Sequence, residues 1–185
     1  MVVQNPLNGR VLAVQGGFDN RISSFNRATQ AQRQPGSTIK PFVYATALES
    51  GMTPASIIVD GPYCVWQGAS LGQKCFRNFS GGGAGPQTMR WGLEQSRNLM
   101  TVRAANDSGM ENVVNTFRAA NIGDYPPYLS YALGAGDTTV LKMTNAYSML
   151  VNHGRELKPT LIDFVQSRSG KVIWPKDWKA CQGCN

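Results

Sequence analysis

The chain has 185 residues, of which 42% are hydrophobic and 16% are charged. This composition excludes a disordered chain and fits one globular domain, which at this length buries roughly 70% of its unfolded surface. Lys and Arg outnumber Asp and Glu by 18 to 11, so the net charge of +7 favours an anionic partner: nucleic acid, an anionic membrane face or an anionic cell-wall polymer. Because no run of five basic residues occurs, we expect no dedicated nucleic-acid-binding arm.

The two ends of the chain carry no membrane or export signal. No apolar stretch reaches the roughly 18 residues that a membrane span needs. The first residues, "MVVQNPLNGR", lack the basic start and apolar core of a signal peptide, and the ending "WPKDWKACQGCN" has no helix or strand pattern. The sequence therefore fits either a cytosolic protein or a piece of a longer exported protein, and its ending favours the second.

The first fifty residues predict a hairpin and a helix. Two short β-branched runs surround an Asn8-Gly9 turn within residues 2–17 and predict a β-hairpin. Residues 18–33 are polar and irregular. The breakers before Ser37 then predict a helix that begins near this serine and ends at Gly51. Its apolar residues at 42–48 cover more than one face, so we expect the helix to be buried.

The middle of the chain predicts a loop followed by two helices. Residues 52–87 are rich in Gly and Pro and predict a long surface connection. Helical spacing then appears on both sides of Ser96-Arg97-Asn98. Because Ser and Asn favour caps and turns over helix interiors, this triplet predicts a short polar break between two helices.

The last third predicts two more helices and a second hairpin. The segment "ENVVNTFRAANIG" is amphipathic and predicts a helix that ends at Gly123. Apolar spacing predicts another helix within residues 137–154, with Asp137 or Thr138 as its N-cap and Gly154 after its end. Residues 161–174 predict a hairpin around a Ser-Gly turn. Together these elements predict a mixed α/β domain.

The four cysteines fall into two pairs. Cys64 and Cys75 could form a disulfide across a loop in an oxidising compartment or stay reduced. Cys181 and Cys184 could form a redox pair, half of a zinc site or a tight disulfide. No neighbouring histidine or βαβ pattern supports the first two of these. We expect no metal site and no cofactor.

Candidate catalytic chemistry centres on Ser37 and Lys40. His153 is the only histidine and stands at a predicted helix end, where a cap or surface role is more common than that of a catalytic base. Without it, a serine nucleophile needs another base, and a lysine can serve if burial lowers its pKa. Positions i and i+3 lie on one helix face, at the end whose free N–H groups favour negative charge. This arrangement suits acyl transfer, with backbone donors at the oxyanion. Spacing alone also fits an N-cap serine followed by a solvated lysine.

A second motif, Ser96-x-Asn98, follows 59 residues after Ser37 on the predicted polar break. With both motifs, the segment "RATQAQRQPGSTIKPFVYATALESGMTPAS" resembles the region around the nucleophile of the bifunctional class A penicillin-binding proteins. "GPQTMRWGLEQSRNLMTVRAA" resembles the second-motif region of that family, and "PPYLSYALGAGDTTVLKMTNAYSMLVNHGRELKPTLI" resembles the helix and strand-turn region that follows. The resemblance spans essentially the whole chain.

The resemblance implies a penicillin-binding-protein/β-lactamase-like fold and a serine DD-transpeptidase that cross-links peptidoglycan. Ser37 would be acylated by a D-Ala-D-Ala stem peptide or by a β-lactam, and Lys40 would be the general base. Ser96 would relay a proton to the leaving group, while Asn98 would bind the substrate amide and position the lysine. The expected partners are stem peptides, lipid-linked glycan strands and β-lactams, with no nucleic acid. The whole protein would lie on the periplasmic side of the inner membrane and also carry a glycosyltransferase.

One departure from the family pattern limits this expectation. No Lys-Thr-Gly triplet follows, and "SGKVI" at 169–173 is no substitute because its order is wrong. Residues 1–185 are therefore expected to be the central part of a transpeptidase domain, with an incomplete sheet that exposes an unpaired edge. The alternatives are a serine β-lactamase or DD-carboxypeptidase, with Glu111 as the nearest candidate to activate water, and a non-catalytic β-lactam- or wall-binding module.

Overall fold

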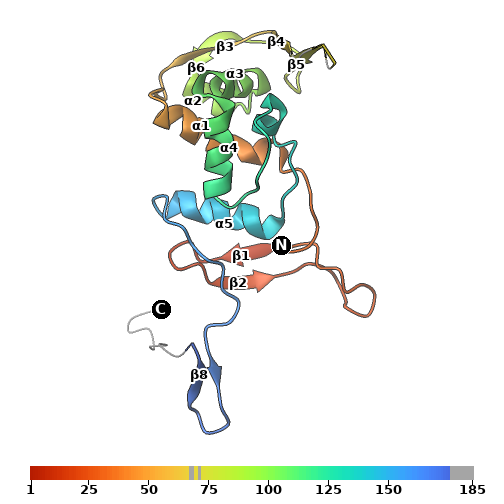
Figure 1. Ribbon diagram of the computed structural model, residues 1–185, viewed down its shortest axis with the longest axis vertical. Helices are drawn as coiled ribbons and strands as arrows, with labels where there is room; N and C mark the ends of the chain where they lie inside the picture. The colour runs from red at the N-terminus through yellow and green to blue at the C-terminus, as the bar shows by residue number, and fades with distance from the viewer. Residues whose placement is uncertain (67–68, 71, 176–185) are drawn as a thin grey trace.

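The computed structural model describes residues 1–66, 69–70 and 72–175, and it shows the predicted mixed α/β architecture (Figure 1). The helices are α1 (Lys40–Glu49), α2 (Met89–Glu94), α3 (Asn98–Ser108), α4 (Met110–Ala119) and α5 (Val140–Val151), with 3₁₀ helices η1 (Gly36–Ile39) and η2 (Leu129–Leu133). The strands form antiparallel pairs: β1 (Val2–Gln4) with β2 (Val11–Val14), β3 (Ile57–Asp60) with β6 (Gly85–Thr88), β4 (Tyr63–Trp66) with β5 (Gln73–Phe76), and β7 (Val165–Gln166) with β8 (Val172–Trp174). Within the described ranges every sheet is two-stranded.

Helix α1 forms the centre of the core. It packs against α3 and α4, and Ile39, Phe42 and Val43 are almost fully buried beside Val114 and Phe117 of α4. Because neighbours cover several faces of α1, a one-sided apolar stripe would not suffice, which explains its nearly continuous apolar sequence. The predicted buried helix is confirmed.

The prediction of a long surface loop at residues 52–87 is wrong in part, because four short strands lie within it. β3 and β6 pair from Ile57 opposite Thr88 to Asp60 opposite Gly85, and β4 pairs with β5. Each strand has only four residues, and Pro86 lies within β6. Strands this short leave too few alternating positions to stand out from the surrounding Gly and Pro residues. The β3–β6 pair packs against α3 and α2.

The other predicted elements are present, with two corrections: α4 ends at Ala119 and not at Gly123, and one helix has a different N-cap. α2 and α3 meet at the predicted polar break, and both terminal hairpins form. The N-cap of α5 is Thr139, whose side chain accepts a hydrogen bond from the Lys142 N–H; it is neither Asp137 nor Thr138. The hydroxyl of Thr138 is committed elsewhere, since it donates to the Ile122 carbonyl at 2.7 Å.

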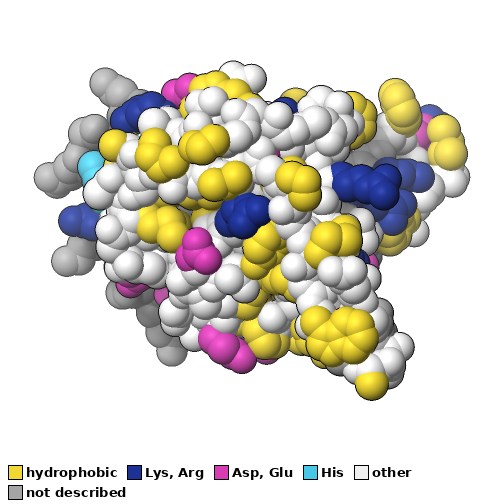
Figure 2. Space-filling model, turned by 90° about the horizontal axis from the view of Figure 1, so that it is seen from above, with side chains coloured by type: hydrophobic (Ala, Val, Ile, Leu, Met, Phe, Trp, Pro, Cys, Tyr) yellow, Lys and Arg dark blue, Asp and Glu magenta, His cyan; other side chains and the backbone are white. Residues whose placement is uncertain are grey.

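Helix α5 lies between the helices around α1 and the β1–β2 hairpin (Figure 1). The Tyr147 hydroxyl of α5 donates to the Thr38 carbonyl at 2.8 Å, and its ring stands edge-on to Phe42 at 5.6 Å. These contacts hold the turn that precedes α1. Of the helices in the described part of the chain, none is long and apolar enough to span a membrane. On the face shown in Figure 2, Lys and Arg side chains lie in several separate places, which fits the scattered basic residues of the sequence.

Candidate active site

Ser37 and Lys40 lie one turn apart, as predicted, but in contrasting environments. Ser37 belongs to the 3₁₀ turn η1 and is exposed, whereas Lys40 begins α1 and is only 1% exposed. The Lys40 N–H donates to the Ser37 carbonyl, which closes the turn. Among the described contacts, the Ser37 hydroxyl makes no hydrogen bond to the Lys40 amine. The Ser37 N–H likewise finds no acceptor in the described part of the chain and remains able to donate.

A close approach of two glycines fixes the backbone in front of Ser37. Gly36 has a φ of +56°, a left-handed conformation that glycine adopts with little steric strain. A Cβ atom on Gly134, just after η2, would lie 2.3 Å from the Gly36 carbonyl oxygen, so only glycine fits there. Three residues before Gly36, the backbones of Arg33 and Thr138 exchange hydrogen bonds at 2.9 and 3.0 Å. The nucleophile turn is therefore held from both η2 and the start of α5.

The Lys40 amine makes three hydrogen bonds, all to the predicted second motif. Nζ lies 2.6 Å from the Ser96 carbonyl oxygen, 3.1 Å from Ser96 Oγ and 2.6 Å from Asn98 Oδ1. None of these acceptors is a carboxylate. Burial, aided by the positive charge of Arg97, lowers the pKa of Lys40 from 10.5 to about 8. A substantial fraction of the amine is then neutral near physiological pH, and a neutral amine can accept a proton.

The turn that bears the second motif adopts an unusual backbone conformation. Ser96 has a φ of +52°, which residues with a side chain rarely adopt. Asn98 begins α3 immediately afterwards, and its Nδ2 donates to the Arg77 carbonyl at 3.0 Å while its Oδ1 faces Lys40. The residues of this segment predicted the turn, and the family resemblance implied that Asn98 positions Lys40.

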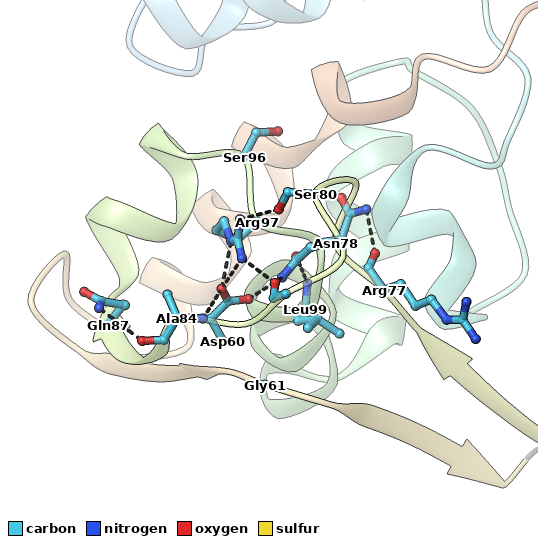
Figure 3. Close-up of polar contacts among 12 residues, drawn as sticks. Asp60, Gly61, Arg77, Asn78, Ser80, Ala84, Gln87, Ser96, Arg97 and Leu99 are labelled. Carbon is cyan, nitrogen blue, oxygen red and sulfur yellow. Dashed lines mark hydrogen bonds and ion pairs between the residues drawn. The ribbon is translucent and has the colours of Figure 1, made fainter.

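Sequence reasoning missed the polar cluster behind this turn, which comprises Asp60, Asn78 and Arg97 (Figure 3). The Asp60 carboxylate is fully buried and lies 2.7 Å from the Arg97 guanidinium. It also accepts from Asn78 Nδ2 at 2.7 Å and from the Ala84 N–H at 2.9 Å. One sequence signal could have found the cluster. Alternation along Ile57–Asp60 places the carboxylate on the same inward face as Ile58, and a buried carboxylate needs a partner.

The two motifs open onto one cleft of about 460 Å³. Its lining consists of Ser37, Asn78, Phe79, Ser80, Gln95, Ser96, Arg97 and Asn98. The Phe79 ring is fully exposed at this cleft. Neither Glu111, exposed in the first turn of α4, nor His153, exposed after α5, lines it. The location of Glu111 therefore gives no support to a β-lactamase-type hydrolysis.

The structure tests one of the two cysteine predictions. Cys64 of β4 lies directly opposite Cys75 of β5, and the two form a disulfide. Cys181 and Cys184 lie outside the described residues. Within the described ranges, no group of three or more His, Cys, Asp or Glu side chains is arranged to hold a metal ion.

Comparison with known proteins assigns the family. Residues 1–180 match the penicillin binding protein transpeptidase domain. The chain belongs to this family. It is 42% identical to penicillin-binding protein 1A of Rickettsia prowazekii over 186 residues, which cover all of this chain and 24% of that relative. The chain thus spans about a quarter of the length of the curated relatives it matches. The class A penicillin-binding-protein resemblance is confirmed.

Solved structures of penicillin-binding proteins confirm the fold. Penicillin-binding protein 1A from Haemophilus influenzae superposes with a TM-score of 0.88 at 36% identity, over 94% of this chain and 26% of that chain. PonA1 from Mycobacterium tuberculosis, in complex with penicillin V, gives a TM-score of 0.82 at 27% identity over 94% and 48%. The predicted penicillin-binding-protein fold is therefore confirmed at the level of the described elements.

Proposed function

We propose that this chain carries the acylation centre of a serine DD-transpeptidase that cross-links peptidoglycan. The observation that carries the proposal is the environment of Lys40, which is buried, faces no carboxylate and contacts both residues of the second motif beside Ser37. A lysine in this setting is suited to be a general base, because its proton is easily lost.

In the proposed reaction, Ser37 Oγ attacks the carbonyl carbon of the penultimate D-alanine, and its proton passes to the neutral Lys40 amine. The free Ser37 N–H is available as one donor to the oxyanion. When the tetrahedral intermediate collapses, the C–N bond breaks and the leaving amine takes a proton from Lys40 through Ser96 Oγ. The 3.1 Å contact between Lys40 Nζ and Ser96 Oγ supports this relay.

Asn98 has two roles in the proposal. Its Oδ1 holds the Lys40 amine at 2.6 Å. Its amide nitrogen has two donors, and the Arg77 carbonyl takes one of them. The second donor is left for the carbonyl of the substrate's amide group.

A β-lactam would enter by the same route, with its ring carbonyl attacked by Ser37. The whole protein would act on lipid-linked glycan strands at the periplasmic side of the membrane and would also contain a glycosyltransferase.

The test is intact-mass analysis after incubation with benzylpenicillin. We expect the native chain to gain the mass of one penicillin, and Ser37→Ala to gain none. Ser50→Ala is the matched control, because this serine ends the same helix and its hydroxyl donates to the Thr46 carbonyl, away from the cleft. Lys40→Met should slow the labelling by about a hundredfold or more, within the range of general-base catalysis. An adduct that persists in Ser37→Ala, or a native chain that never reacts, would refute the proposal.

A further inference from the structure

The Ser96–Asn98 turn sends its three side chains to two different places. Ser96 and Asn98 contact the Lys40 amine, whereas Arg97 points to the opposite side and reaches the Asp60 carboxylate. Figure 3 shows Ser96 directed away from the cluster that Arg97 and Asp60 form. The same three residues therefore connect the candidate catalytic lysine to an ion pair whose carboxylate is buried.

We propose that Arg97, anchored by Asp60, is a positioning residue for the acylation reaction: it fixes the turn that presents Ser96 and Asn98 to Lys40. This inference rests on the proposed function for its role in catalysis. Arg97 touches no reacting atom in this role and acts through its two neighbours.

The guanidinium of Arg97 donates hydrogen bonds in several fixed directions. Its Nε and one terminal nitrogen both lie 2.7 Å from Asp60 Oδ2. The other terminal nitrogen donates to Ser80 Oγ at 3.0 Å, and a further bond of 2.7 Å goes to the Gly82 carbonyl. A planar guanidinium can bond in these directions at once, and a lysine ammonium at the same position cannot reproduce the fork.

The loop on the other side of the ion pair is fixed by the same carboxylate. Asp60 accepts from Asn78 and from the Ala84 N–H, and Asn78 in turn accepts from the Leu99 N–H at 3.2 Å in the first turn of α3. The turn is thus held from both sides while Ser96 stays at a φ of +52°. A non-glycine residue keeps such a conformation only where its surroundings enforce it.

Arg97 also acts on Lys40 through its charge. Charged groups on or beside the elements that pack against α1 are Arg90, Glu94, Arg97, Arg103, Asp107, Glu111 and Arg118. Of these, Arg97 is the one whose charge lowers the pKa of Lys40, after burial. Geometry and charge can therefore be separated by substitution. Arg97→Lys keeps the charge but loses the fork, and Arg97→Gln loses both.

The experiment measures two quantities on the same variants: the rate constant of acylation by benzylpenicillin as a function of pH, and the pKa of Lys40 from NMR titration of ¹³Cε-labelled lysine. For Arg97→Lys we expect acylation to slow by about tenfold to a hundredfold, the range for misplaced catalytic groups, with the Lys40 pKa still near 8. For Arg97→Gln we expect a similar loss and a Lys40 pKa that moves upward from about 8, yet stays below 10.5 because burial persists.

The matched control is Arg118→Gln, which removes an arginine from an ion pair with Asp124 at the exposed surface of α4. It should change neither quantity. Arg97→Lys retains a cation opposite Asp60, so it decides the question even if Arg97→Gln does not fold, as circular dichroism would reveal. Native rates in Arg97→Lys would overturn the inference. A slower rate in both variants with an unshifted Lys40 pKa in a folded Arg97→Gln would support positioning through the geometry of the guanidinium contacts alone.

If benzylpenicillin does not acylate the native chain, the proposed function is refuted, but the effect of Arg97 on Lys40 can still be tested. The NMR titration still tests the electrostatic link between the Arg97 charge and Lys40, because it needs no reaction. An upward shift in Arg97→Gln, absent from Arg118→Gln, would then support that link, whereas equal pKa values in all variants would overturn it.

Discussion

Lys40 and Arg97 are two cations on opposite sides of one turn, Lys40 buried and Arg97 17% exposed, and their partners differ in charge. Lys40 contacts three neutral oxygens, from Ser96 and Asn98, and no carboxylate. Arg97 lies against the Asp60 carboxylate, which is fully buried. Without an anion to stabilise its charge, Lys40 loses its proton more easily. The guanidinium of Arg97 cannot deprotonate in a protein, so it keeps its charge, and the Asp60 carboxylate neutralises that charge.

The titration of Asp60 is consistent with this division. Burial by itself raises the pKa of a carboxyl group, but the hydrogen bonds from Asn78, Arg97 and the Ala84 N–H outweigh burial and hold the pKa of Asp60 below its usual value of 3.8. Asp60 therefore stays ionised at neutral pH. The Asp60 carboxylate pairs with Arg97 and makes no contact with Lys40, so Lys40 can lose its proton and act as a base.

The largest effect should come from removing that anion. Asp60→Asn keeps the shape of the side chain but leaves Arg97 with no charge partner, and breaking a buried pair in this way typically costs about 3–5 kcal/mol. Urea unfolding measures the loss. The matched control is Asp124→Asn, in an ion pair whose side chains are 54% and 74% exposed, where we expect a change below about 1 kcal/mol. Equal losses in the two variants would show that burial gives the Asp60 pair no special importance.

The next largest effect is the change in the free energy of unfolding with pH that the titration of Lys40 produces. Its pKa is about 8 in the folded protein and 10.5 in the unfolded chain. Between these values the unfolded chain binds more protons, so stability rises as pH increases from 8 to 10.5. The shift corresponds to about 3 kcal/mol, which is gained over this window and is absent below pH 8.

Lys40→Met isolates this contribution, because tyrosines with raised pKa values, such as Tyr44, titrate alike in both proteins. We expect the free energy of unfolding of the native chain to rise relative to that of Lys40→Met across this window. The measurement is urea unfolding of both proteins at half-unit steps of pH. A difference that stays flat or falls would mean that the neutral oxygens stabilise the ammonium enough to offset its burial.

The two cations also differ in how well the sequence predicted their surroundings. The Lys40 site was predictable because its parts lie at fixed spacings within two helices and one turn, and because both motifs resemble those of a known family. The Arg97 site was not, because Asp60 and Asn78 lie in a Gly- and Pro-rich segment whose strands are four residues long. The pairing of Cys64 with Cys75 depended on the register of those same strands, which the spacing of the cysteines alone left open.

The smallest effect in free energy should come from placing a carboxylate beside Lys40, as Asp60 lies beside Arg97. Asn98→Asp places a carboxylate where Oδ1 now lies 2.6 Å from Nζ. An anion at this distance raises the pKa of the lysine, so the fraction of neutral amine at pH 7 should fall about a hundredfold, which corresponds to about 2.7 kcal/mol. Acylation by benzylpenicillin should slow by a similar factor at pH 7 and recover as the pH is raised.

The recovery at high pH is what distinguishes charge from geometry in this variant. Asn98→Asp also loses the donor to the Arg77 carbonyl, a defect that pH does not repair. Asn98→Leu is the matched comparison, since it loses the same donor and the oxygen at Lys40 without adding a charge. If the rate of Asn98→Asp stays low at every pH, as we expect for Asn98→Leu, the main role of Asn98 is to hold the turn. If it recovers, the absence of an anion beside Lys40 is itself a functional feature of the site.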